Sequence, residues 1–235
     1  MKKLIIIFIA LGLSLVLFNS FSWAYWVIEG EGKWQEEVYQ FSWEKEGGKM
    51  VLSLEEGEKS ILRVGVDLAK PELSLIDDLS FTFSTLEDKN GIALSFLFAL
   101  SSILGVKEEW LFAEKPSFFL LPDPLSLPPF GDCFPFRIND EVTGWYFKEG
   151  IHPTMGEMVG DLVKILEEGK LSLPFWREIV KVNGLIVAKE ENEELVLRVY
   201  QVKEKDTPLE LPQKGEDYRE VSWVDFLSPW EAILE

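Results

Sequence analysis

The 235-residue sequence has a single cysteine and a single histidine, and this scarcity limits the chemistry that it can support. With only Cys133 available, a disulfide within the chain is excluded. A lone histidine is poor material for a metal site, and His152 precedes Pro153 in what is interpreted as a loop. Cys133 and His152 could pair as nucleophile and base, but nothing in the sequence sets the distance between them. We therefore predict no catalytic residue, no metal ligand and no cofactor.

Several catalytic and ion-binding motifs are also missing. The chain has no glycine-rich phosphate loop, no G-x-S-x-G nucleophile elbow and no D-x-D-x-D-G calcium loop. Acidic clusters occur at Asp77-Asp78, Glu87-Asp88 and Glu190–Glu194. They are interpreted as solvated turn charges, with calcium binding as the alternative. No spacing singles out a carboxylate pair for glycoside hydrolysis, so an acidic hydrolase is only the third hypothesis for function.

Positive charge is scarce as well. The sequence has 23 Lys and Arg against 41 Asp and Glu, for a formal net charge of -18. Such an acidic surface repels phosphate backbones and anionic headgroups, which argues against nucleic acid as a partner. Abundant Glu and Lys, with only four Met and one Cys, are typical of proteins from thermophiles.

The N-terminal 24 residues have the order of a secretory signal peptide. Lys2 and Lys3 precede an apolar run from Leu4 to Phe18, and Ser22-Trp23-Ala24 resembles a cleavage site. Cleavage near Ala24 would leave residues 25–235 as an exported, periplasmic or extracellular protein whose membrane contact is confined to the signal. The loss of two lysines would take the formal charge from -18 to -20. An uncleaved membrane anchor is the alternative.

Residues 92–112 are predicted to form an apolar helix. The run from Ile92 to Val106 is interrupted only by three serines and one glycine. Fifteen residues span roughly 22 Å, which is short of the ~30 Å hydrocarbon core of a bilayer. A helix without a polar face is therefore expected to be buried against a sheet or to line an apolar groove, with Leu97 and Leu100 buried, and a second transmembrane segment is the alternative.

The segments on both sides of this helix alternate between apolar and polar residues. Strands are predicted around 39–43, 50–54, 62–68, 79–83, 141–147 and 195–200, with a hairpin of 175–182 and 185–189 around Asn183-Gly184. Tryptophans such as Trp43 and Trp223 fall within strand patterns and are interpreted as core, with a carbohydrate-binding face as the alternative. No repeat or flexible linker is evident, so residues 25–235 are expected to form one domain.

Proline and phenylalanine dominate residues 115–136. Because proline disfavours helix interiors and central strands, this stretch is predicted to be a long loop lying over an apolar surface. It is interpreted as a lid over the core or, alternatively, over a ligand groove whose mouth is lined by Phe118, Phe119 and Phe130.

A second helix is predicted over residues 154–168. Thr154 and Glu157 have capping-box spacing, and an apolar stripe beginning with Met155 and Met158 ends at Gly169. The simplest interpretation is a helix lying on the sheet, and the alternative is a methionine-lined lipid groove. Ser228-Pro229 predicts the start of a short terminal helix.

Two stretches resemble an exported family of proteins. The strands from Phe41 to Leu68, with Glu46-Gly47-Gly48-Lys49-Met50 at the turn, are similar to the start of the LolA/LppX lipoprotein-carrier group. The segment from Leu209-Glu210-Leu211-Pro212 to Tyr218-Arg219-Glu220-Val221 is similar to their C-terminal part. The resemblance implies a curved antiparallel half-barrel whose apolar concave side is covered by helices and receives lipid. The sequence departs from the group in the inserted Pro/Phe segment.

These observations predict an α+β fold with a curved antiparallel sheet and helices on its apolar face. The first hypothesis is a non-enzymatic carrier for a lipid or another apolar ligand. The predicted ligand-binding residues are Leu97, Leu100, Phe118, Phe119, Phe130, Met155 and Met158. The alternative is a cell-envelope structural or interaction module that uses the Pro/Phe segment to bind another protein.

Overall fold

The computed structural model describes residues 25–34, 37–104, 106–222 and 225. The predicted signal peptide of residues 1–24 and the predicted terminal helix from Ser228 lie outside the described residues.

A long antiparallel meander forms the first half of the sheet. Its strands are β1 (Tyr25–Trp34), β2 (Glu37–Glu46), β3 (Lys49–Glu56), β4 (Lys59–Asp67), β5 (Glu72–Asp77) and β6 (Thr82–Leu86). Each strand pairs with the next through a tight connection, as the alternating pattern predicts.

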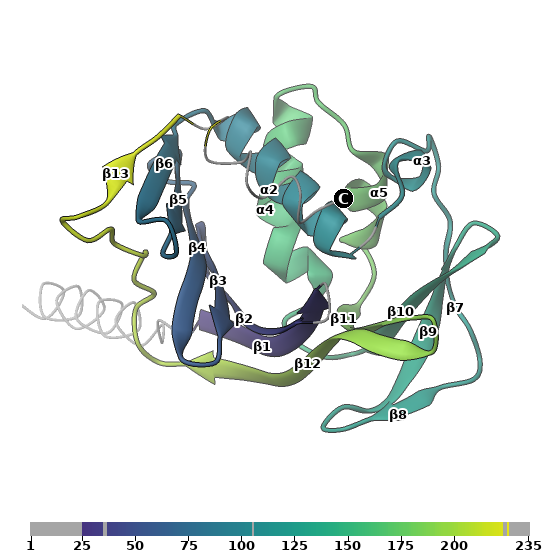
Figure 1. The fold of residues 1–235 in the computed structure, drawn as a ribbon. Coiled ribbons are helices and arrows are strands. Elements are labelled where there is room, and N and C mark those ends of the chain that lie inside the picture. The colour runs from purple at the N-terminus through teal and green to yellow at the C-terminus, as the bar shows by residue number, and fades with distance from the viewer. Residues whose placement is uncertain (1–24, 35–36, 105, 223–224, 226–235) are drawn as a thin grey trace, which may run out of the picture.

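The second half of the chain extends this sheet mainly on the side of β1 and adds one short strand at the β6 edge. Its strands are β7 (Phe118–Leu120), β8 (Leu125–Leu127), β9 (Gly131–Ile138), β10 (Glu141–Glu149), β11 (Gly184–Glu191), β12 (Glu194–Lys205) and β13 (Arg219–Glu220). The described residues thus form 13 strands, in which β12 pairs antiparallel with β1 and β13 pairs parallel with β6. The prediction of a curved antiparallel sheet built from both ends of the chain is confirmed (Figure 1).

Helices lie inside the curve of the sheet (Figure 1). Helix α2 (Lys89–Leu104) packs on α4 (Met155–Glu168) and contacts β5, while α4 also contacts β11. The shorter helices α3 (Glu108–Leu111) and α5 (Pro174–Ile179) pack on each other. The predicted capping box of α4 is present, because the side chains of Thr154 and Glu157 each accept a hydrogen bond from the backbone N–H of the other.

The predicted apolar helix of residues 92–112 is divided. Helix α2 ends at Leu104 and α3 begins at Glu108, with Lys107 in an extended conformation before it. The backbone N–H of Val106 donates to the Ser101 carbonyl at 2.7 Å, which closes the end of α2. The apolar run therefore continues across a helix end, which hydropathy alone does not reveal.

The prediction of a structureless Pro/Phe loop is wrong in part. Residues 115–136 include β7, β8 and the first part of β9, and Pro135 lies within β9 opposite Tyr146. The β9–β10 ladder is irregular between Val142 and Tyr146, and irregularities of this kind accommodate a residue without a backbone N–H. The Pro135 carbonyl still accepts a hydrogen bond from Leu121 at 2.9 Å.

Two predicted strands also need correction. Residues Leu79 and Phe81 form an exposed turn, and β6 begins only at Thr82. The first strand of the predicted 175–182 hairpin is the helix α5, which starts with Pro174 in its first turn. Proline is favoured there, and the buried Phe175, Trp176 and Ile179 follow helical rather than alternating spacing.

Aromatic rings fill the interior where β9 and β10 meet the helices. Phe136 stacks on Trp145 with ring centroids 6.1 Å apart, and Trp145 meets Trp110 and Phe175 edge to face at 6.0 Å each. Phe118 stacks on Phe136 at 5.4 Å and so belongs to the same cluster. The concave side of the sheet is therefore a packed core at this end.

Candidate functional site

Two apolar side chains of α2 reach the surface. Most apolar residues of this helix are buried against α4 and the sheet, but Leu94 is only partly buried and Phe98 keeps 37% of its surface exposed. The Phe98 ring lies 6.3 Å from that of Phe112, which is 50% exposed. We refer to Leu94, Phe98 and Phe112 as the α2 surface. It is an apolar patch in which Leu94 and Phe98 come from α2 and Phe112 from the end of α3.

A shallow groove lies beside the α2 surface, between α2, α4 and α5. It has no internal volume that would hold even one water molecule, and it is lined by Leu97, Val163, Leu166, Glu167, Leu171, Ser172, Leu173, Trp176 and Arg177. Leu171 is 42% exposed, so the lining reaches the surface at an apolar residue, next to the polar Glu167, Ser172 and Arg177. Pockets for small ligands usually measure ~300–1,000 Å³. A ligand would therefore have to lie over the α2 surface or shift neighbouring side chains to enter the groove.

The seven predicted ligand-binding residues do not line one common site in the structure. All four of Leu97, Leu100, Met155 and Met158 are buried in the core cluster, and of these only Leu97 also borders the groove. Met155 and Met158 therefore pack α4 into the core, as the simplest interpretation of that helix expects.

The three predicted phenylalanines do not line a common mouth. Phe118 and Phe119 are neighbours in β7 and so point to opposite sides of the sheet. Phe118 contacts Phe175 edge to face at 5.6 Å, whereas Phe119 is 47% exposed with the Arg137 guanidinium 5.1 Å from its ring centre. Phe130 is partly buried and packs on the core cluster. The phenylalanines point to different sides because part of the Pro/Phe segment forms strands, in which neighbouring side chains alternate.

The sequence did not identify the other residues that line the groove, because their apolar patterns are those of ordinary core residues. Val163 and Leu166 belong to the predicted apolar stripe of α4, and Trp176 was assigned to a strand. Leu171 lies in the connection after α4, where one apolar residue carries no signal of its own. The surface they form depends on how α2, α4 and α5 meet.

Two buried indoles hold α2 in place. The Trp145 Nε1–H donates to the Leu104 carbonyl at 2.8 Å, at the C-terminal end of the helix. The Trp176 Nε1–H donates to Ser101 Oγ at 2.9 Å, and that hydroxyl donates to the Leu97 carbonyl at 2.7 Å. Ser101 thus interrupts the apolar run because it satisfies a buried indole.

A partly buried ion pair fixes α4 to the sheet. Lys45 in β2 is a buried cation, and its Nζ lies 2.6 Å from Oδ2 of Asp161 in α4. Asp161 is half exposed, so the pair extends from the interior to the surface. Removal of Asp161 would leave the buried ammonium without this partner, which is costly. The helix layer is therefore held by polar contacts as well as by packing.

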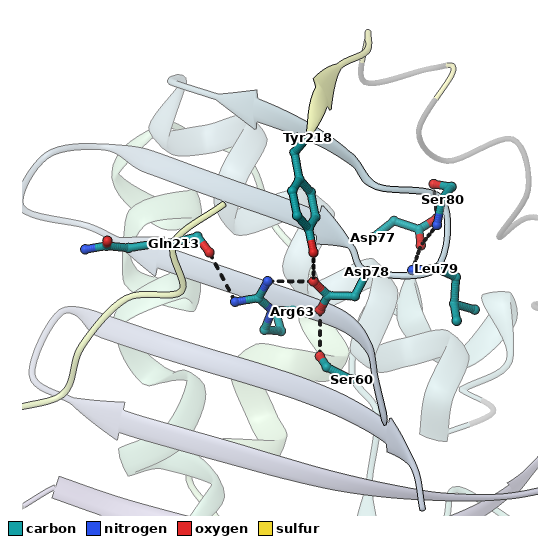
Figure 2. A network of polar contacts seen from close by, with 8 residues as sticks. All are labelled: Ser60, Arg63, Asp77, Asp78, Leu79, Ser80, Gln213 and Tyr218. Carbon is teal, nitrogen blue, oxygen red and sulfur yellow. Dashed lines mark hydrogen bonds and ion pairs between the residues drawn. The ribbon is translucent and has the colours of Figure 1, made fainter. Parts of the chain in front are cut away.

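A polar network on the sheet centres on Asp78 (Figure 2). The Arg63 guanidinium donates to both Asp78 carboxylate oxygens, from Nε at 2.7 Å and from Nη2 at 2.6 Å. The hydroxyls of Ser60 and Tyr218 donate to the same carboxylate, and Arg63 Nη1 also donates to the Gln213 carbonyl at 3.2 Å. The network ties the segment before β13 to β4 and β5, which is a structural role.

The two residues of the acidic pair Asp77-Asp78 have different roles: Asp77 accepts backbone hydrogen bonds, and Asp78 is the centre of this network. Asp77 is buried and accepts hydrogen bonds from the N–H groups of Leu79 at 2.8 Å and Ser80 at 3.0 Å. This is the Asx-turn use of aspartate. The interpretation of Asp77-Asp78 as solvated turn charge is therefore wrong, although both residues do lie at a turn. Within the described part of the chain, no group of three or more potential metal ligands occurs.

Acid is expected to weaken the Asp78 network. Burial by itself raises the pKa of Asp78, but hydrogen bonds from Arg63, Ser60 and Tyr218 and the Arg63 charge outweigh it and hold the pKa below its usual value. A carboxyl whose folded pKa is depressed contributes stability above its unfolded pKa of about 3.9 and loses it as the pH falls through the folded pKa.

The measurement is urea unfolding of the wild type and Asp78→Asn between pH 7 and pH 2.5. Asp78→Asn should be less stable at pH 7, by about 1–3 kcal/mol for a lost charged hydrogen-bond partner, and the difference should shrink below about pH 4. Asp123→Asn, at an exposed position, is the matched control and should follow the wild type. A difference that stays constant with pH would contradict the role of the Asp78 charge.

Cys133 and His152 have separate environments. Cys133 is buried in β9 with Sγ 3.4 Å from the Gly131 carbonyl, and burial raises the pKa of its thiol. His152 is exposed, and its Nδ1 lies 3.0 Å from Glu157 in the first turn of α4. A nucleophilic thiol needs a lowered pKa and access to solvent, so Cys133 is a packing residue.

None of the described helices is long and apolar enough to cross a membrane. No protein-family model matches the chain, and no curated protein matches it. The similarity to the LolA/LppX group therefore stays a prediction.

Proposed function

We propose that the protein is an exported, non-enzymatic binding or carrier protein for an apolar ligand such as a lipid acyl chain. The observation that supports this proposal is the α2 surface. Helix α2 lies in the concave side of a curved sheet and exposes Phe98, and Leu94 in part, to solvent, next to a groove to which Leu97, Leu171 and Trp176 contribute. In this proposal the sheet is a half-barrel and its helices form the movable side of the binding site.

The affinity expected for a carrier indicates how much apolar surface must contact the ligand. A micromolar complex corresponds to about 8 kcal/mol, and each buried methylene contributes about 0.8 kcal/mol, so roughly ten methylenes must be buried. The groove has no internal volume for a ligand, so by itself it cannot hold that length. The ligand must therefore also cover Phe98 and Phe112, or displace part of α2 from α4.

Binding of a fluorescent fatty acid to delipidated protein tests the proposal. The wild type should bind with micromolar or better affinity. Phe98→Ser and Leu171→Ser should each weaken binding by about tenfold or more, because each removes apolar contact area at a partly exposed position. Phe81→Ser is the matched control, since Phe81 is an exposed phenylalanine in the turn before β6. If the wild type shows no saturable binding, the carrier function fails.

A second candidate is an envelope interaction module that uses the Pro/Phe segment. Phe119, Arg137 and Val142 lie side by side across β7, β9 and β10, and both Phe119 and Val142 are exposed. An exposed aromatic residue next to an arginine is typical of protein interfaces. Phe119→Ser separates the candidates, because it should leave fatty-acid affinity unchanged and weaken only the binding of a protein partner.

Export is the part of the proposal that comes from the N-terminal sequence. With the signal order of residues 1–24, N-terminal sequencing of the secreted or periplasmic protein should begin at or near Tyr25. Recovery of intact Met1 in a membrane fraction would identify a retained anchor instead.

A further inference from the structure

We propose that Lys45 and Trp43 in β2 form the headgroup end of the ligand site and select a ligand that carries a carboxylate. The ligand would then be a long-chain carboxylic acid rather than a neutral lipid. This inference rests on the function proposed above and names the chemical class of the ligand. It is carried by two buried groups of β2 whose hydrogen-bonding capacity is not fully used.

Both side chains lie on the concave side of the sheet, beneath the helices. Alternate residues of a strand share one face, and Trp43 and Lys45 are each 7% exposed. The Trp43 ring lies 6.3 Å from that of Phe96 in α2, and Lys45 Nζ lies 2.6 Å from Oδ2 of Asp161 in α4. The two groups therefore lie under the same pair of packed helices, and a ligand that separates α2 from α4 would reach them (Figure 1).

Several N–H donors at this place have no acceptor. The Trp43 Nε1–H is buried and has no hydrogen-bond partner among the described residues. The Lys45 ammonium has three N–H donors, and the described part of the chain supplies a single acceptor for them, Asp161. The cross-strand neighbours of Lys45, Trp26 and Met50, have no side-chain oxygen. Because buried donors are normally satisfied, this excess of donors points to an acceptor that a ligand supplies.

The charge of Lys45 decides which acceptor fits. A buried ammonium needs a counter-ion, and the side chain of its present one, Asp161, is 53% exposed. Asp161 can therefore turn into solvent, and a ligand carboxylate that takes its place keeps the ammonium paired. An ester or an alcohol would leave the buried charge without a counter-ion. The exchange of one carboxylate for the other also releases the contact that fixes α4 to the sheet, so headgroup binding and helix movement are coupled.

The spacing of the two donors suits one carboxylate. Side chains two residues apart leave a strand roughly 7 Å from each other. Two hydrogen bonds of about 2.8 Å each, together with the width of one carboxylate, span a similar distance. The formal charge of -18 opposes an anion at long range, but salt screens exposed charges more strongly than a buried pair.

Binding of a fluorescent fatty acid and of its methyl ester to delipidated protein tests the inference. The ratio of the two affinities is the readout, because a change in stability or in helix mobility alters both affinities alike. The wild type should prefer the acid by about tenfold or more, as expected for a charged hydrogen-bond pair. Lys45→Met, with a side chain of similar length, should remove this preference.

The two proposals fail in different ways in this experiment. A wild type that binds acid and ester equally, or a preference that survives in Lys45→Met, would overturn the role of the headgroup and leave the proposed function intact. A wild type that binds neither compound would overturn both.

Asp161→Asn separates headgroup exchange from a purely structural ion pair. Asparagine still accepts a hydrogen bond from Lys45 but does not compete as an anion, so the preference for the acid should rise by about threefold or more. If the pair only holds α4 on the sheet, acid and ester should gain affinity equally, which would contradict the inference. Glu168→Gln is the matched control, since Glu168 pairs with the exposed Lys164 on the same helix, and it should leave both affinities unchanged.

The Trp43 indole provides a measurement that does not depend on affinity. Its Nε1–H proton signal, identified by its absence in Trp43→Phe, should move downfield when the acid binds and clearly less when the ester binds. Trp43→Phe should also lower the preference for the acid by about threefold. An equal shift with both compounds, or no shift with the acid, would overturn the assignment of Trp43 to the headgroup.

Discussion

Replacing Trp145 with alanine is expected to lower the free energy of unfolding by about 3–5 kcal/mol, the typical cost of emptying a buried tryptophan site. Trp145 is fully buried in β10. Its ring stacks on Phe136 and meets Trp110 and Phe175 edge to face. These neighbours come from a strand and from two different helices, so the cavity cannot close without moving several elements.

The hydrogen bond of this indole contributes separately. Trp145→Phe keeps most of the apolar volume but leaves the Leu104 carbonyl at the end of α2 without its indole donor. An unsatisfied buried carbonyl costs about 1–3 kcal/mol, so Trp145→Phe should lie between the wild type and Trp145→Ala.

Urea unfolding followed by circular dichroism measures both variants. Phe119→Ala is the control for removing an aromatic residue from a strand, and it should cost less than about 1 kcal/mol because the ring is half exposed. Equal losses for Trp145→Phe and Trp145→Ala would show that the hydrogen bond, rather than the ring packing, dominates. A loss below 1 kcal/mol for Trp145→Ala would contradict a packed aromatic core.

The strands of the first half were predictable because their signal is local. Alternating residues such as Phe41 and Trp43, with glycines at the turns, set both the strand and the face that it buries. The capping box of α4 is equally local, since Thr154 and Glu157 are three residues apart. In each case a short stretch contains its own hydrogen-bonding and burial pattern.

The second half depends on contacts that the sequence does not display. The stretch with Phe175 and Trp176 is too short for periodicity to distinguish a buried strand from a buried helix, and its packing on α3 decides. Pro135 is tolerated in β9 only because the adjacent ladder is irregular. The α3–α5 contact arises between segments far apart in the chain, whereas the ladder irregularity lies within the β9–β10 hairpin.

The candidate site was predictable only through Leu97 and the apolar character of α2. An apolar side chain carries the same signal whether it lies only in the core, as Leu100 does, or also borders a groove from the core, as Leu97 does. The difference arises from the way in which α2 meets α4 and α5. Leu171 illustrates the same limit, because its role follows from a connection that brings it next to Trp176.

Replacing Leu100 with alanine tests whether α2 stays fixed in the core or moves when a ligand binds. Its side chain is buried in the core cluster, in the middle of the helix. Leu100→Ala should therefore lower the free energy of unfolding by about 2–5 kcal/mol through lost transfer energy and a residual cavity. Leu79→Ala, in the exposed turn before β6, is the matched control and should stay within about 0.5 kcal/mol of the wild type.

The same substitution reports on ligand entry. If a fatty acid must shift α2 away from α4, Leu100→Ala weakens the packing that opposes this movement, and the affinity should rise even though stability falls. If the ligand rests only on Phe98 and Phe112, the affinity should stay at the wild-type value. Urea unfolding and fatty-acid titration on one preparation provide both numbers. A loss of stability below about 0.5 kcal/mol would contradict the burial of Leu100 and with it the packing of α2 against α4.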